Sequence, residues 1–200
     1  MIRTFFALIF FLSAISAHPV IFKNGKVFWL TQNPSFNDIR FGVSKSSNWL
    51  IGGRFLEDRN SNETFALINN NFLAMRWNNR NSQANLYLLS SVGLDTKNSK
   101  SMGTIGLHGD WEDRQFMVMQ MLEYYSYSSA VVSNTRFAYS PYTADYSKTS
   151  TWLIAHYRVE YSNDKYSYMF FPVVRLFKKN YLVEIGFNRD NSFLTFMTHF

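Results

Sequence analysis

The chain has 200 residues, of which 46% are hydrophobic and 18% aromatic, and it contains no cysteine. Its formal charge of +6 comes from Lys and Arg residues that are scattered rather than clustered, so the composition shows no nucleic-acid-binding surface. The absence of Cys fits an exported protein that uses no disulfides, and a slightly negative mean hydropathy suits strands that are apolar on one face only.

The first 17 residues have the form of a secretory signal peptide. A short basic head that ends at Arg3 precedes an almost unbroken apolar run from Phe5 to Ile15, and Ser16 and Ala17 close the run. A run of about a dozen residues is too short for a membrane-spanning helix, which needs about 20. We predict cleavage after Ala17 and one mature domain from residue 18 to residue 200. The alternative is a buried strand at the start of a cytosolic domain.

Polar turn clusters recur along the mature chain at nearly regular intervals. The segments between them have about 8 to 12 residues, which is the length of a tilted transmembrane strand. Eleven such turns predict 12 strands, and an even number puts both ends of the chain on the same side of a membrane. The clusters lie at residues 33–35, 45–47, 58–62, 78–81, 95–101, 112–114, 125–129, 140–147, 162–164, 178–180 and 189–191.

Two segments fit this pattern less well. The run from Asn69 to Asn71 turns at least one Asn toward lipid unless a bulge or a shorter strand intervenes. Pro172 lies within a strand, where it removes a ladder hydrogen bond, so a bulge is expected there. A count of 10 strands is therefore an alternative to 12.

Apolar and charged residues alternate within the segments. Leu153, Ala155 and Tyr157, for example, alternate with His156 and Arg158. Because successive side chains of a strand point to opposite faces, this pattern puts the charges on one face. After residue 17 no apolar run approaches the length of a spanning helix, so a membrane-embedded chain has to be a closed barrel with a polar lumen. Tyr and Trp near the strand ends predict aromatic belts at the two membrane interfaces.

The last segment alternates in the same way from Tyr181 to Phe187, resumes at Leu194 and ends on Phe200. This ending resembles that of Gram-negative outer-membrane β-barrel proteins, in which a terminal Phe is the signal read by the barrel assembly machinery. The resemblance implies an antiparallel up-and-down transmembrane barrel that contacts outer-membrane lipids. The alternative is a soluble secreted β-sandwich, a binding protein whose apolar faces meet in one core.

Three short stretches carry a further resemblance. His18-Pro19-Val20, Arg76-Trp77-Asn78 and the segment from Ser82 to Tyr87 resemble a group of uncharacterised bacterial outer-membrane proteins associated with heavy-metal handling genes. The resemblance implies a role in metal handling and implies no catalytic residue.

The sharpest local motif is Met117-Val118-Met119-Gln120-Met121, which Glu123 follows. In a strand the three methionines share one face, and the apolar and aromatic residues of the other face suit lipid, so the methionines are predicted to point inward. The same parity turns the following residues inward: His108, His156, Met169, Met197 and His199. Thioether sulfur selects Cu(I) and Ag(I), and imidazole also binds copper, so we expect a path or store for soft metal ions. The alternative is that Met fills an irregular interior.

Cleavage after Ala17 creates a second candidate metal ligand. The mature chain would begin at His18, whose α-amine and ring Nδ1 can chelate one ion, and Pro19 has no N–H that could compete. The arrangement is similar to the N-terminal histidine chelate of copper oxygenases. If His18 lies at the rim where the last strand ends, His199 is expected to be its neighbour.

The remaining inward charges predict a structural lumen rather than an active site. Arg158, Glu160, Arg175 and Glu184 are expected to form a salt-bridged plug, and a selective pore lining is the alternative. The chain has no His-x-Ser motif of the kind that lipid-modifying outer-membrane enzymes carry, so we predict no enzyme activity and assign no catalytic residue. The expected function is an outer-membrane barrel of structural or transport type; a lipid-modifying enzyme is the alternative.

Overall fold

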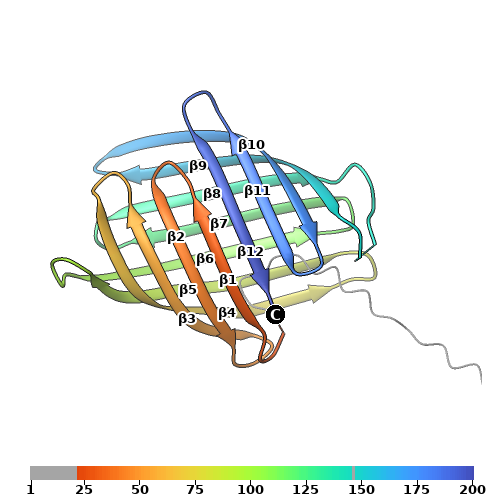
Figure 1. Ribbon diagram of the computed structural model, residues 1–200, viewed down its shortest axis with the longest axis horizontal. Coiled ribbons are helices and arrows are strands. Elements are labelled where there is room, and N and C mark those ends of the chain that lie inside the picture. The colour runs from red at the N-terminus through yellow and green to blue at the C-terminus, as the bar shows by residue number, and fades with distance from the viewer. Residues whose placement is uncertain (1–21, 146) are drawn as a thin grey trace, which may run out of the picture.

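A computed structural model describes residues 22–145 and 147–200, so the predicted signal peptide and His18 lie outside the described residues. Twelve antiparallel strands form a closed barrel in which each strand pairs with its neighbours in sequence and β1 pairs with β12 (Figure 1). The strands are β1 (Lys26–Gln32), β2 (Phe36–Ser44), β3 (Trp49–Asp58), β4 (Glu63–Asn78), β5 (Gln83–Asp95), β6 (Ser101–Glu112), β7 (Phe116–Tyr125), β8 (Ala130–Tyr139), β9 (Ser150–Ser162), β10 (Lys165–Lys178), β11 (Tyr181–Phe187) and β12 (Ser192–His199).

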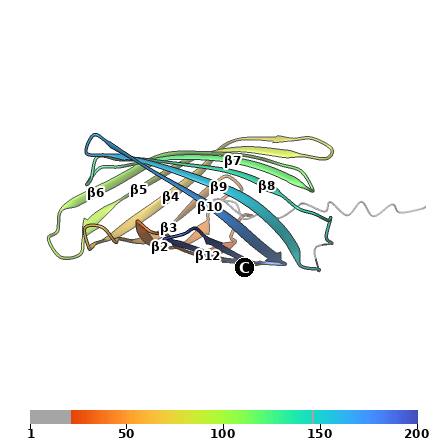
Figure 2. The ribbon, with the colours of Figure 1, turned by 90° about the horizontal axis from the view of Figure 1, so that it is seen from above.

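The predicted fold class and strand number are confirmed. Each of the eleven predicted turn clusters overlaps a connection between two consecutive strands. The described residues contain no helix long and apolar enough to cross a bilayer. Seen from above, the barrel is flattened, with β2, β3 and β12 along one wall and β5, β6 and β7 along the opposite wall (Figure 2). Inward side chains from the two walls can therefore meet across the lumen.

The bulge lies in β4 rather than at Pro172. Pairing of β4 with β5 shifts between Leu73 and Met75, whereas Pro172 pairs with Ala155 in an unbroken β9–β10 register. The expected bulge at Pro172 is thus wrong. Pro172 lies one residue beyond Val173, where the β10–β11 pairing ends, and proline is tolerated at such an edge.

One asparagine of β4 does face outward, as the alternation requires. Asn69 and Asn71 are buried inside the barrel, whereas Asn70 lies on the outer face. Its side chain accepts a hydrogen bond from Trp49 Nε1 and donates one to Ser90 Oγ. Its polar atoms therefore have partners within the sheet, which lowers the cost of placing an amide on an apolar surface.

The outer face is apolar across the middle of the strands. Large hydrophobic side chains are exposed on every strand from β2 to β12. In a soluble β-sandwich, by contrast, the apolar faces would meet in a core. This apolar outer surface fits a membrane location. The residues include Ile39, Phe41, Phe55, Ile68, Leu88, Ile105, Leu107, Phe137, Leu153, Phe170, Val174 and Ile185.

Exposed aromatic residues lie near both ends of the barrel. We call the end at which β1 begins and β12 ends the terminal rim, and the opposite end the far rim. Aromatic side chains near the terminal rim are Trp49, Trp77, Trp111, Phe116, Tyr139 and Tyr181, and those near the far rim are Tyr124, Tyr166, Tyr168 and Phe187. Their positions match the predicted aromatic belts of a membrane barrel.

The connections differ in length between the two rims. At the far rim they are residues 33–35, 59–62, 96–100, 126–129, 163–164 and 188–191, whereas the terminal rim carries the longest connection, residues 140–149. The two-residue far-rim turn has both residues, Asn163 and Asp164, at positive φ, which is the geometry of a tight type I′ hairpin. Bacterial outer-membrane barrels usually have their longer loops on the side opposite the termini. In this barrel the longest connection lies on the same side as the ends of β1 and β12.

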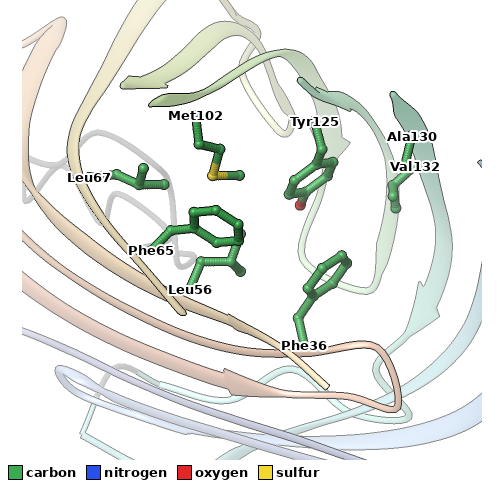
Figure 3. Close-up of a cluster of buried hydrophobic side chains, with 8 residues drawn as sticks. All are labelled: Phe36, Leu56, Phe65, Leu67, Met102, Tyr125, Ala130 and Val132. Carbon is green, nitrogen blue, oxygen red and sulfur yellow. The ribbon is translucent and has the colours of Figure 1, made fainter. Parts of the chain in front are cut away.

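The interior is filled by apolar groups as well as by polar ones. At the far rim, Phe65, Leu56 and Met102 pack with Phe36 and Tyr125 (Figure 3). A second group joins Met197 and Leu182 to Tyr87 and Leu89 on the opposite wall. A third group surrounds Phe171 on the β7–β12 side. The lumen is thus packed over much of its length, and the polar side chains lie between these apolar groups.

Candidate functional site

A cavity of about 120 Å³ remains in the lumen between the apolar groups. Side chains of β1, β2 and β6 to β12 line it, and they include four methionines, two histidines and several ion pairs. Its volume corresponds to a few water molecules, because one water occupies about 30 Å³ of liquid. The cavity is therefore of a size for a small ion with its ligands.

The ion pairs nearest the far rim form what we call the Arg54 network: Asp38, Arg40, Arg54 and Glu123. Arg54 Nη1 lies 2.5 Å from Glu123 Oε1, and Arg54 Nη2 lies 2.9 Å from Asp38 Oδ2. Arg40 binds the same carboxylate oxygen of Asp38 at 2.6 Å. Because Arg54 comes from β3 and Glu123 from β7, these contacts join the two walls across the lumen.

Arg54 is fully satisfied in this position. Its side chain is 1% exposed, and Nε donates to Asp38 Oδ1 at 3.1 Å. The terminal nitrogens also contact Ser91, Thr104 and Tyr125 at 3.3 Å. A buried guanidinium is tolerated only when its charge and its donors are matched, and here both conditions hold.

A second group, the Glu184 network, contains Arg136, Arg175 and Glu184. Arg175 Nη2 lies 2.7 Å from Glu184 Oε1, and Arg136 Nη1 lies 3.0 Å from Glu184 Oε2. Two guanidinium groups share one carboxylate, so the group carries one net positive charge. Arg136 Nε is buried without a hydrogen-bond partner, and Arg175 Nη1 donates to the sulfur of Met117 at 3.6 Å.

The four residues predicted to form one lumen network fall into two separate groups. Arg175 and Glu184 belong to the Glu184 network, whereas Arg158 Nη2 pairs with Glu160 Oε2 at 3.0 Å on β9. Glu160 also accepts a hydrogen bond from Ser35 Oγ in the connection between β1 and β2. This pair therefore fastens β9 to the far rim of the opposite wall.

The three methionines of β7 line the cavity in a row, which we call the methionine row. In the β6–β7 register Met117 lies opposite Glu112, Met119 opposite Asp110, and Met121 opposite His108. Met117 and Met119 are buried and Met121 is partly buried. Each thioether consequently lies beside an imidazole or a carboxylate of the neighbouring strand.

Two histidines line the same cavity, each with one ring nitrogen engaged. His108 Nε2 lies 3.2 Å from Asp110 Oδ2, and His156 Nε2 lies 3.1 Å from Asn134 Oδ1. In both rings Nδ1 is buried without a hydrogen-bond partner. Because both oxygens accept, Nε2 carries a proton in each ring. In the neutral form of either ring Nδ1 then presents its lone pair.

The residues predicted to bind metal do not form one group. Met117, Met119, Met121 and His156 line the cavity, but His199 is buried opposite Val27 at the terminal rim and does not line it. His18 lies outside the described residues, so its expected proximity to His199 stays a prediction. In the described ranges no three His, Asp or Glu side chains converge as a metal site, and such a site would have to use thioether sulfur.

His108 and Asp110 were not among the predicted ligands. The alternation predicted that His108 points inward, and its position on the strand before the methionine motif is the signal that could have identified it. A His-x-Asp spacing is common in strands, however, and only the β6–β7 register shows that His108 lies opposite Met121.

Phe200 closes the seam between the first and last strands. Its N–H donates to Lys26 O at 3.0 Å, and its carbonyl accepts from Lys26 N at 2.7 Å. The ring is 62% exposed at the terminal rim. An exposed terminal aromatic is the form expected of the predicted assembly signal, whose recognition stays a prediction.

Comparison of the chain with models of protein families, with curated proteins and with solved structures finds no match.

Proposed function

We propose that this protein is an integral β-barrel of the bacterial outer membrane, of structural or transport type, whose lumen binds or passes soft monovalent cations such as Cu(I) and Ag(I). The observation that carries the metal assignment is the methionine row, in which three inward thioethers line a small cavity beside His108 and Asp110. Thioether sulfur is a soft ligand that favours these ions over Mg²⁺ or Ca²⁺.

The outer face supports the membrane location. Its exposed apolar side chains lie between two sets of aromatic residues, and a barrel satisfies all backbone hydrogen bonds without an open edge. Lipid would cover the apolar surface that water would otherwise contact.

The lumen supports binding of a small ion better than it supports an open pore. The Arg54 network joins the two walls across it, the Glu184 network links β8, β10 and β11, and the apolar groups fill much of the remaining space. Passage of a solute as large as a sugar would require these pairs to separate. A partly dehydrated cation needs far less space.

Two measurements on the mature protein purified in detergent test the proposal. Unboiled and boiled samples should migrate differently on a detergent gel, because a folded membrane barrel resists unfolding by the detergent. Equal migration together with solubility in buffer free of detergent would contradict the membrane location.

The second measurement is a Cu(I) titration against a chromophoric Cu(I) chelator. The wild-type protein should compete with the chelator, and replacement of Met117, Met119 and Met121 by Leu together with His18→Ala should abolish competition. Met102→Leu is the matched control, because Met102 is buried in the far-rim apolar group and does not line the cavity. Unchanged affinity in the fourfold variant would exclude these four residues as the binding site, and a wild-type protein that does not compete would exclude the metal-binding function.

A further inference from the structure

We infer that the soft cation binds at the end of the methionine row marked by Met121, between His108 Nδ1 and the sulfurs of Met121 and Met119, with Asp110 as a positioning residue. This inference rests on the proposed function and specifies which side chains carry it.

His108 has the arrangement of a metal-binding imidazole. Its Nε2–H donates to Asp110, and Asp110 also accepts a hydrogen bond of 2.7 Å from Asn85 Nδ2, which fixes the carboxylate. An imidazole that ligates a metal commonly donates its other N–H to a carboxylate, which fixes the tautomer and makes the free nitrogen more basic. The free nitrogen here is Nδ1, which is buried beside the cavity without a hydrogen-bond partner.

The three methionines differ in what surrounds them. Met117 Sδ already accepts a hydrogen bond from the positively charged Arg175. Met119 lies between Asp110 of β6 and Arg136 of β8, and Met121 lies between His108 of β6 and Asn134 of β8. Met117 has Glu112 opposite on β6, but its sulfur is already engaged by a guanidinium, whereas no guanidinium lies opposite Met121 on either neighbouring strand. The row is therefore graded, with its strongest site at the His108 end.

His156 is disfavoured by the same reasoning. Its Nδ1 is also without a partner, but Arg136 lies opposite on β8 and Arg158 is two residues away on the same face of β9. Between two guanidinium groups an additional cation is repelled. His156 is consequently the natural control for His108, because both rings are buried, line the cavity and have Nε2 engaged.

The test is a titration of the full mature protein in detergent with Ag(I), and with Cu(I) under reducing conditions. Met121→Leu and His108→Asn should each weaken binding about 100-fold, and Met119→Leu about tenfold, whereas Met117→Leu and His156→Asn should change it less than about threefold. Leu keeps the volume of Met, so folding of the Met121 variant is retained even if His108→Asn destabilises the barrel. X-ray absorption of the Ag(I) or Cu(I) complex should show two sulfur scatterers and one nitrogen scatterer, and the nitrogen should disappear in His108→Asn.

The results separate the two levels of the proposal. If the wild-type protein binds neither ion, the proposed metal function fails. If the wild-type protein binds but Met121→Leu leaves affinity unchanged, or if Met117→Leu and His156→Asn produce the larger losses, the function stands and this site is wrong.

Asp110 requires a test that distinguishes positioning from simple structural support. Asp110→Asn should weaken binding about tenfold, and Asp110→Glu should restore most of it, because the carboxylate that accepts from Nε2 is regained. The gel shift between unboiled and boiled samples should be the same in both variants. Equal losses of affinity in Asp110→Asn and Asp110→Glu would remove Asp110 from the site.

Discussion

The Arg54 network and the methionine row both include residues of strand β7, but they differ in whether their polar groups have partners. Glu123 of β7 is paired with a guanidinium whose nitrogens all have partners. A few residues earlier on the same inward face, Met119 and Met121 line a cavity beside an imidazole with a free nitrogen.

This difference separates fully paired from incompletely paired side chains within one strand, and under the proposed function it separates a structural role from a binding role. In the Arg54 network every charge is matched across the lumen, so a ligand could enter only by breaking existing bonds. In the methionine row the thioethers are soft and uncharged, and of the three only Met117 accepts a hydrogen bond from within the described ranges, donated by Arg175. Under the proposed function a cation can be added at Met119 and Met121 without displacing a partner. Polarity alone would have selected the Arg54 network as the candidate binding site, whereas incomplete pairing selects the methionine row.

Arg54→Met should produce the largest loss of stability. The substitution leaves two buried carboxylates, Asp38 and Glu123, to share Arg40, which lies 2.6 Å from Asp38 but 3.9 Å from Glu123. The uncompensated charge should lower the free energy of unfolding by about 3–5 kcal/mol. Urea unfolding of the barrel in lipid vesicles measures the change. The double variant Arg54→Met, Glu123→Gln should recover much of the loss, because it removes one charge of each sign and leaves Asp38 paired with Arg40. If Arg54→Met lowers the free energy of unfolding by less than about 1 kcal/mol, the Arg54 network does not hold the two walls together.

Glu184→Gln should have the next largest effect. It leaves Arg136 and Arg175 facing each other without a carboxylate, and we expect a loss of about 2 kcal/mol by the same unfolding measurement. The effect is smaller than that of Arg54→Met, because the side chain of Arg136 is 13% exposed and water in the cavity can partly solvate it. A loss that equals or exceeds that of Arg54→Met would reverse the ranking of the two networks.

Replacement of Met117, Met119 and Met121 by Leu should hardly change stability. Leu and Met have similar volumes, so the free energy of unfolding should fall by less than about 1.5 kcal/mol, while cation binding is lost. A parallel measurement of unfolding and Cu(I) affinity in the triple variant checks both statements. Severe destabilisation would indicate that the three methionines are needed for packing of the barrel interior.

The smallest effect concerns a second link between the walls, just beyond Arg54 and Glu123. Tyr127, in the connection after β7, donates a hydrogen bond to Asp58 at the end of β3. Burial of the Tyr127 hydroxyl is the larger cause, and this hydrogen bond the next, of a pKa above the ordinary value of 10.0. Tyr127→Phe should cost about 1 kcal/mol at neutral pH. Because the pKa is raised on folding, the contribution of Tyr127 is complete below pH 10 and is lost as the pH rises further. Unfolding curves of the two proteins should therefore converge above pH 10, and a constant difference would contradict the pKa assignment.

The alternation of residue types predicted the faces of the barrel, because side-chain direction in a strand is a local property. It placed Met117, Met119 and Met121 inward, and the polar clusters located all the turns. Pro172 misled the prediction, because whether a missing N–H matters depends on where the neighbouring strand ends. That end is set by β11, which a reading of β10 alone cannot supply.

Contacts across the lumen could not be predicted in the same way. Arg54 and Glu123 are far apart in sequence and come from strands that do not pair, so their meeting depends on the flattening of the closed barrel. The importance of His108 likewise depends on the β6–β7 register. The sequence can identify which residues enter the interior, but the closed shape determines which of them meet.

The short connections of the far rim also bear on how a cell would display this protein. If the terminal rim faces the periplasm, only turns of two to five residues project outward from the cell. Such short turns would expose little surface to which an antibody or a bacteriophage could bind on an intact cell. An epitope tag inserted within residues 96–100 would be the practical way to make the barrel visible from outside.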